Sequence, residues 1–305
     1  MIRELIHRLA RVGVTGGNPA HAAIDRSLAN EPNGIPGGSS ARELRMLPVD
    51  GDLADVQAGD IAQLKVDGIG GLFVPPAGIV TTNGVPMDCA THCIPGLERM
   101  ARAMGEEMVF DGEYSEEGGF NATNSAFRKG RGLGVFWVYD AVPLREWTRN
   151  VFTQPIEQRL ERINRALPHS ESVFVGALDH WVVDPVEAER KALELWALGF
   201  EGLVVKRAGS LYERARSRAW RRIKREATHD CQVVDVLDAV GDQVRNIMVR
   251  GPEGSPVRLK VPDAFEGREH LRAGAWIEMS CWPVVGGGVR GARLVRMRPD
   301  KEGVR

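Results

Sequence analysis

One lysine stands where a buried strand is expected to end, in the stretch Gln63-Leu64-Lys65-Val66-Asp67-Gly68. An amine acts as a nucleophile only after losing its proton, and burial or neighbouring cations lower its pKa toward that state. The Asp67-Gly68 pair is typical of a hairpin turn between strands at 61–66 and 69–74. Lys65 is therefore a candidate nucleophile, although such a lysine more often extends from a strand end into water.

Other stretches also place charges beside apolar runs. Asp111 and Glu113 lie two residues apart, so both point to one face of a strand. Arg222 and Lys224 share a strand face for the same reason. Further charges of this kind are Asp140, Glu201, Lys206, Arg298, Asp300 and Lys301. Acids and amines that emerge from several strands can converge into one polar cleft.

The elements that would position these residues alternate between short strands and helices. The helix at 184–198 is the clearest, because Asp184 is followed by proline and then, three residues after the cap, by Glu187. The other expected elements are strands at 61–66, 69–74, 108–114, 134–140, 173–178 and 202–206, and helices at 95–104 and 154–167. Since hairpins outnumber strand–helix–strand units, the pattern indicates an α+β domain with antiparallel-rich sheets.

The last third of the chain has a different character. Residues 207–228 carry eight basic residues against two acids. Strand-like runs follow at 231–237, 243–250, 257–261, 275–282 and 289–297, with a helical stretch at 264–272 before the fourth. This order is typical of a small all-β barrel of the OB-fold type. We expect a helix and an irregular segment over 1–40, an α+β domain over 41–228 and the barrel over 229–305.

Charge and cysteine content narrow the class of protein. The net charge of −1 divides into −8 before residue 207 and +7 from there on, which suggests a polyanionic partner. Four scattered cysteines are typical of reduced thiols rather than of a disulfide scaffold. No apolar run is long enough to span a membrane, and the first residues are too charged for a signal peptide. We expect a cytoplasmic protein with no membrane partner.

Six motifs occur together in one order: Lys65-x-Asp67-Gly68, Asp111-Gly112-Glu113, Tyr139-Asp140-x-x-Pro143-Leu144, Glu201-Gly202-x-Val204-Val205-Lys206, Trp220-x-Arg222-x-Lys224 and Arg298-x-Asp300-Lys301. Their order and spacing resemble the motifs of the covalent nucleotidyltransferase superfamily. This superfamily comprises ATP-dependent DNA ligases, RNA ligases and messenger-RNA capping enzymes. The resemblance covers about residue 44 to the end, and the length favours a compact two-domain DNA ligase of the phage or bacterial type.

The resemblance implies a nucleotidyltransferase (adenylation) domain followed by an OB-fold, and an enzyme that uses ATP with Mg²⁺ or Mn²⁺. Lys65 would attack the α-phosphate of ATP, forming lysyl-AMP and expelling pyrophosphate. The AMP would pass to the 5′-phosphate of a nick in duplex DNA, and the 3′-hydroxyl would then displace it. For such in-line transfers a protein supplies mainly position and charge. The expected protein is a monomer in a bacterial or phage-infected cell, active in replication or repair.

The resemblance also implies roles for single residues around the phosphates and the metal. Lys206, Arg222 and Lys224 would surround the α-phosphate, and their charge would lower the pKa of Lys65. Glu113 would contact the ribose, and Glu201, helped by Asp67, would hold the metal or orient the 3′-hydroxyl. The expected catalytic residues are thus Lys65, Asp67, Glu201, Lys206 and Lys224, and the expected metal ligands are Glu113 and Glu201.

Three further groups complete the expected contacts. Tyr139 and Val204 would pack on the two faces of adenine, with Gln63 and Leu64 beside the base and Gln63 reading its amino group. Arg298, Asp300 and Lys301 on the barrel would orient the pyrophosphate, which requires the two domains to close. Phosphates of the DNA would meet Arg214, Arg216, Arg218 and Arg221 in contacts that are independent of sequence and sensitive to salt.

The chain departs from the superfamily pattern at three positions. The lysine motif usually continues to an arginine, which is Gly70 here, and the later S-R-N-G stretch reads Thr81-Thr82-Asn83-Gly84. Arg222 stands where a lysine is usual. The missing arginines normally help to contact phosphates. Arg42, Arg45 or Arg128 could replace them in space.

Alternative functions stay open at this point. Within the superfamily these are an RNA ligase and a GTP-dependent capping guanylyltransferase. Outside it, the chain could be a non-catalytic nucleic-acid-binding protein with a degenerate scaffold. The final Arg298-x-Asp300-Lys301 motif and the barrel favour a DNA ligase over an RNA ligase, and the choice of nucleotide separates a ligase from a capping enzyme.

Overall fold

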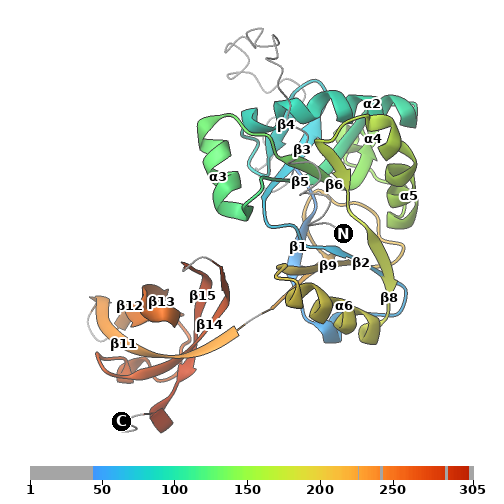
Figure 1. Ribbon diagram of the computed structural model, residues 1–305. Coiled ribbons are helices and arrows are strands. Elements are labelled where there is room, and N and C mark those ends of the chain that lie inside the picture. The colour runs from blue at the N-terminus through green and yellow to red at the C-terminus, as the bar shows by residue number, and fades with distance from the viewer. Residues whose placement is uncertain (1–43, 226, 241–242, 286–287, 302–305) are drawn as a thin grey trace. The chain divides into compact units, whose positions relative to one another are not determined.

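The computed structural model describes residues 44–225, 227–240, 243–285 and 288–301 (Figure 1). The helix and irregular segment expected over 1–40 lie outside the described residues. The chain divides into two compact units, of which the first ends at Ile223 and the second begins at Lys224. The sequence placed this boundary a few residues later, near 228.

The first unit contains two five-stranded sheets, A and B. Sheet A has the order β1 (Leu47–Asp50), β10 (Arg216–Lys224), β9 (Gly202–Lys206), β2 (Asp60–Leu64) and β8 (His180–Val183). One face of sheet A packs Leu64, Leu203 and Val205 against helix α6 (Pro185–Ala197), which Figure 1 shows beneath β9 and β2. The α6 helix begins as predicted, because the Asp184 side chain accepts a hydrogen bond from the Glu187 amide.

Sheet B has the order β4 (Gly78–Thr81), β3 (Ile69–Val74), β5 (Met108–Ser115), β6 (Val135–Pro143) and β7 (Val175–Ala177). The helices of this region are α2 (Ile94–Met104), α3 (Gly119–Lys129), α4 (Leu144–Arg149) and α5 (Ile156–Ala166). Side chains alternate along the strands, so Phe110 packs toward α2 and α5 while Val109 packs on the other side around Trp147 and Trp220. Both faces of sheet B are therefore covered.

The Asp67-Gly68 turn does not join a hairpin, so that prediction is wrong. Strand β2 pairs with β8 and β9, whereas β3 pairs with β4 and β5. Both partners of β2 come from distant parts of the sequence, and β3 pairs with the following strand β4 and with the more distant β5. A local turn signal carries no information about which strands pair. Residues 65–68 instead cross from sheet A to sheet B, which places Lys65 between the two sheets.

The second unit is one antiparallel sheet in the order β13 (Pro256–Lys260), β12 (Gln243–Arg250), β11 (Ala227–Val240), β14 (Trp276–Val285) and β15 (Gly288–Met297). The first and last strands of this order also contact each other, so the sheet curls around a core that includes Ile247, Leu259 and Ile277. The helix predicted at 264–272 is only one 3₁₀ turn, Arg268–His270, because Gly267 at φ 85° interrupts the helical backbone. The predicted α+β domain and partly open barrel are otherwise confirmed.

Candidate active site

A pocket of about 230 Å³ opens between sheets A and B of the first unit. Eight of the predicted site residues line it, and they come from five of the six motifs and from both sheets: Gln63, Leu64, Lys65, Glu113, Tyr139, Val204, Lys206 and Arg222. The other lining residues are Arg45, Leu47, Pro48, Val66, Gly70, Thr82, Leu178 and Trp220. The fold therefore brings together predicted residues that are up to 159 positions apart in the sequence, from Gln63 to Arg222.

The antiparallel register of β2 and β9 explains which side chains lie beside Lys65 in this pocket. Gln63 lies opposite Val204, and the Lys65 amide donates to the Gly202 carbonyl at 2.9 Å. Because side chains alternate along a strand, Gln63 and Val204 share the pocket face, whereas the Leu64 side chain packs into the core beside α6. The same register puts Glu201, one residue before β9, beside Lys65.

Lys65 is held by a carboxylate at the pocket wall. Its Nζ lies 2.6 Å from Oε2 of Glu201, and the two side chains are 19% and 15% exposed. The amine therefore does not extend from the strand end into open water, which was the alternative interpretation of Lys65 from the sequence. It is accessible from the pocket, and the nearest acidic oxygen is already at hydrogen-bond distance.

A second amine, Lys206, lies deeper in the same pocket. Its side chain is fully buried, and its Nζ donates to the Tyr139 carbonyl at 2.6 Å and sits 4.1 Å from the centre of the Trp220 ring. The pKa of Lys206 is lowered to about 8, mainly by burial and also by the charges of Arg159 and Arg45, which outweigh the opposite effect of Asp140 and Asp111. This amine is a cation placed at the pocket floor before any ligand arrives.

Glu113 faces the lysines from sheet B. Loss of water around this carboxylate raises its pKa to about 7, although the charges of Arg45 and Lys65 act in the opposite direction. The adjacent Asp111 does not line the pocket. It is buried behind the pocket and paired with Arg45 at 2.5 Å, and it accepts a hydrogen bond from the Tyr212 hydroxyl at 2.6 Å.

The apolar side of the pocket has one oriented polar group. The Gln63 side-chain nitrogen donates to the Leu178 carbonyl at 3.4 Å, while its Oε1 is buried with no hydrogen-bond partner among the described residues. The ring of Tyr139 lies edge-on to that of Trp220, with ring centres 5.9 Å apart. A flat, partly apolar ligand would find aromatic surface here and one unsatisfied acceptor.

Other predicted residues lie at the edge of the pocket or away from it. Arg222 lines the pocket, but its guanidinium pairs with Asp50. Asp67 does not line it, and its carboxylate lies 3.7 Å from the Cβ position of Gly119 at the start of α3. Lys224 does not line it either. Of the five predicted catalytic residues, Lys65 and Lys206 thus line the pocket, whereas Asp67, Glu201 and Lys224 do not.

The remaining predictions fall on charged residues that, with the exception of Arg218, have partners of their own. In the second unit, Arg298 pairs with Asp230 and with Asp300 (2.8 Å), and Lys301 lies 3.2 Å from Asp230. Among the basic residues of 207–228, Arg214 stacks on the Trp147 ring, whereas Arg216 donates to the Pro48 carbonyl and Arg221 to the Asp55 carbonyl. Arg218 is exposed, and no hydrogen bond or ion pair to it occurs among the described residues.

Sequence reasoning gave no role to several residues of the site. Arg45 appeared only as one of three replacement candidates, and Arg128, which is exposed on α3, does not line the pocket. Arg42 lies outside the described residues. Trp220 is the first residue of the motif Trp220-x-Arg222-x-Lys224, but only the fold shows that its ring packs against Lys206. No sequence signal links Arg45 to Asp111, because 66 residues separate them.

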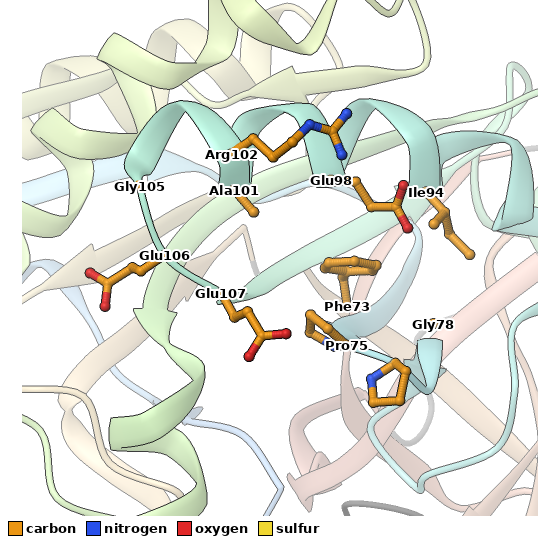
Figure 2. A pocket seen from close by; sticks show the side chains of 11 residues that line it. Phe73, Pro75, Gly78, Ile94, Glu98, Ala101, Arg102, Gly105, Glu106 and Glu107 are labelled. Carbon is orange, nitrogen blue, oxygen red and sulfur yellow. The ribbon is translucent and has the colours of Figure 1, made fainter.

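A larger cavity, of about 600 Å³, lies elsewhere in the first unit. Figure 2 shows Ile94, Glu98, Ala101 and Arg102 of α2 above Phe73, with Glu106 and Glu107 at one side. It contains no lysine and none of the predicted site residues, and Glu106 is already paired with Arg145 and Arg162. The smaller pocket is therefore the candidate active site.

Several solved structures share the fold of this chain. One named "Pmar-Lig_Pre." aligns over 83% of this chain and 67% of its own, with a TM-score of 0.67 and 18% identity. One from a study of Lig E DNA ligases aligns over 83% and 98%, with a TM-score of 0.64 and 18% identity. The ATP-dependent DNA ligase from bacteriophage T7, in complex with ATP, aligns over 85% and 100%, with a TM-score of 0.53 and 17% identity. These likenesses confirm the predicted fold.

The sequence is also similar to a curated protein. The multifunctional non-homologous end joining protein LigD from Pseudomonas aeruginosa is 29% identical over 161 residues. The match covers 50% of this chain but only 18% of LigD, so it spans less than a fifth of that protein. No family model matches the chain.

Proposed function

We propose that this protein is an ATP-dependent DNA ligase that seals nicks between a 5′-phosphate and a 3′-hydroxyl in duplex DNA. The observation that carries the proposal is the pocket, in which Lys65 lies beside residues of four other nucleotidyltransferase motifs. The fold that the chain shares with DNA ligase structures supports it, as does the sequence similarity to LigD. We expect the protein to act as a monomer in the cytoplasm.

The first step in this proposal takes place at Lys65. Its Nζ attacks the α-phosphorus of ATP, a nitrogen–phosphorus bond forms, and the bond to the pyrophosphate oxygen breaks. Glu201 holds the amine in one position at 2.6 Å, and Lys206 presents a buried cation to the phosphate oxygens. A second displacement moves AMP to the 5′-phosphate, and a third joins the 3′-hydroxyl and releases AMP.

The unsatisfied acceptor of Gln63 supports ATP over GTP. Because the side-chain nitrogen donates to Leu178, Oε1 is the atom left for a ligand. The 6-amino group of adenine donates hydrogen bonds, whereas guanine carries an acceptor oxygen at that position. Guanine would therefore leave the buried Oε1 unsatisfied, which costs about 1–3 kcal/mol.

Glu113 lines the pocket, whereas Glu201 does not line it and lies beside Lys65, so these carboxylates would hold a magnesium ion only together with the substrate. Among the described residues there is no group of three or more His, Cys, Asp or Glu side chains that could hold a metal. Mg²⁺ commonly binds through one or two carboxylates, with phosphate oxygens and water as its other ligands. Glu113 and Glu201 would be those carboxylates, and the bound ion would neutralise charge on the phosphates.

The adduct assay tests the proposal directly. The protein is incubated with Mg²⁺ and α-labelled ATP, GTP or NAD, and we expect an acid-labile protein–AMP adduct with ATP alone. The adduct should be absent in Lys65→Ala, and the wild-type adduct should disappear when nicked duplex DNA is added. No adduct in the wild type would favour a nucleic-acid-binding protein, an adduct with GTP would favour a capping enzyme, and sealing restricted to nicked RNA would favour an RNA ligase.

A further inference from the structure

The segment before β1 carries an arginine into the nucleotide pocket. Leu44 and Met46 are buried in the core of the first unit, and the Trp147 indole donates to the Leu44 carbonyl at 3.0 Å. Arg45, between them, lines the pocket, although only 3% of it is exposed. The hydrogen bond from the Met46 amide to the Tyr212 hydroxyl, at 3.1 Å, fixes the backbone on the other side of Arg45.

The guanidinium of Arg45 is held by several partners, and one of its donor atoms has none among the described residues. Nη2 pairs with Asp111 at 2.5 Å and donates to the Gly112 carbonyl at 3.3 Å, while Nη1 donates to Thr82 Oγ1 at 3.2 Å. Its Nε is buried and has no hydrogen-bond partner among the described residues. A buried donor without a partner is costly, and a ligand oxygen in the pocket would satisfy it.

The same guanidinium occupies the space beside the two positions that lack an arginine. A Cβ on Gly70 would lie 2.2 Å from Nη1 of Arg45, a distance that no side chain can adopt without displacing it. Gly70 is not among the described glycines with a positive φ, so its backbone does not require glycine. Glycine at this position leaves the space that the Arg45 guanidinium occupies, and Thr82 supplies a hydrogen bond that holds Nη1 there.

We propose that Arg45 is a nucleotide-binding residue of this pocket, which serves in place of the arginines absent at Gly70 and Thr82 and donates from Nε to the sugar–phosphate part of bound ATP. This rests on the proposed function, because ATP is the ligand. Glu113, the expected ribose contact, lies in the field of the same guanidinium. The Tyr139 ring centre is 5.5 Å from its central carbon, so Arg45 faces the region between ribose and base.

Two measurements test the inference separately from catalysis. ATP affinity is measured by equilibrium titration in a Lys65→Ala background, so that no adduct forms. We expect Arg45→Lys to weaken ATP binding by about 10- to 100-fold, as the loss of a hydrogen bond to a charged group predicts. The matched control is Arg159→Lys, because Arg159 is 1% exposed and pairs with Asp140 but does not line the pocket. It should lower the melting temperature and leave ATP affinity within about twofold.

The spatial argument is tested by a double-mutant cycle. Gly70→Ala should destabilise the wild type and weaken ATP binding, because its methyl group displaces the guanidinium. In the Arg45→Lys background the same change should cost little, since a lysine ends short of the Nη1 position. If Arg45→Lys proves unstable, Gly70→Ala with the Arg45→Met/Asp111→Asn pair gives the same cycle without an unpaired buried charge.

The outcomes separate the two proposals. Unchanged ATP affinity in a folded Arg45→Lys protein overturns the role of Arg45, and additive effects of the two substitutions overturn the explanation for Gly70. A wild-type protein that binds ATP but forms no adduct overturns the ligase proposal and leaves the Arg45 inference standing.

Discussion

The two units hold their cations in opposite ways. In the first, Lys206 is fully buried and donates to a backbone carbonyl, and Lys65 has a single carboxylate beside it at the pocket wall. In the second, Arg298 and Lys301 are 18% and 40% exposed, and both contact Asp230. Arg298 contacts Asp300 as well. In the first unit a charge is already buried, whereas in the proposed reaction the cations of the second unit would have to exchange carboxylates for phosphates.

This contrast predicts a large effect of removing the buried amine. Lys206→Met should lower the rate of adduct formation by about 10²- to 10³-fold, which is typical for the loss of one preorganised charge contact. The assay is a single-turnover measurement with saturating ATP. A matched change at the half-buried Lys191, which pairs with Glu194 on α6 and lies outside the pocket, should leave the rate unchanged. A Lys206→Met protein with the wild-type rate would contradict the phosphate-binding role.

The same substitution should change the dependence of stability on pH. Burial lowers the pKa of Lys206 to about 8 from its usual 10.5, so between these values the folded protein binds fewer protons than the unfolded chain. The free energy of unfolding therefore rises with pH across this window, and below it the buried charge costs on the order of 3 kcal/mol. We expect Lys206→Met to gain most in melting temperature at pH 7 and least at pH 10.

A smaller and more selective effect is expected in the second unit. Arg298→Ala and Lys301→Ala should each slow adduct formation by about 10- to 100-fold, because their proposed contacts are to the leaving pyrophosphate. Neither should slow the sealing of a nick that is already adenylated. The two steps are measured separately with ATP and with a pre-adenylated nicked duplex. An equal loss in both assays would contradict the prediction that these residues of the second unit act only in adduct formation.

The sequence identified the chemistry of the pocket better than its geometry. Lys65, Glu113, Lys206 and Tyr139 were predicted to share a site because each belongs to a motif, and all four line the pocket. Their convergence depends on pairings such as Gln63 with Val204, which no local pattern encodes. The wrong hairpin has the same origin, because the turn residues define a reversal of the chain and not the partner of the strand.

Arg45 marks the limit of sequence reasoning in this protein. Its importance comes from Asp111, Thr82 and the space above Gly70, which meet it only in the folded chain. From the sequence alone, a glycine in place of an expected arginine indicates only the loss of a phosphate contact. The structure shows that the side chain of another residue fills that volume, which is a packing relation between positions 25 residues apart.

Removing the carboxylate that pairs with Arg298 and Lys301 should change the rate of adduct formation by a few-fold. Asp230 contacts both Arg298 and Lys301, so Asp230→Asn removes a competitor for the phosphates. Because exposed ion pairs contribute only about 0–1 kcal/mol, adduct formation should speed up by at most about fivefold. The rate is measured at low and moderate salt. A slower rate would mean that Asp230 positions these cations rather than restraining them.

The smallest effect is expected among the basic residues between 207 and 223 in the first unit, where Arg218 differs from Arg214 in its contacts. Arg218 is exposed, whereas Arg214 stacks on Trp147 with its guanidinium 4.6 Å from the ring centre. A phosphate contact adds about one unit to the slope of log affinity against log salt. Arg218→Ala should therefore reduce that slope for nicked DNA by about one and leave the melting temperature unchanged. Arg214→Ala should instead lower the melting temperature, because it removes packing against Trp147. The reverse pattern, a slope that depends on Arg214 and not on Arg218, would mean that the stacked arginine leaves Trp147 to meet the DNA, and the first unit would then also exchange partners on binding.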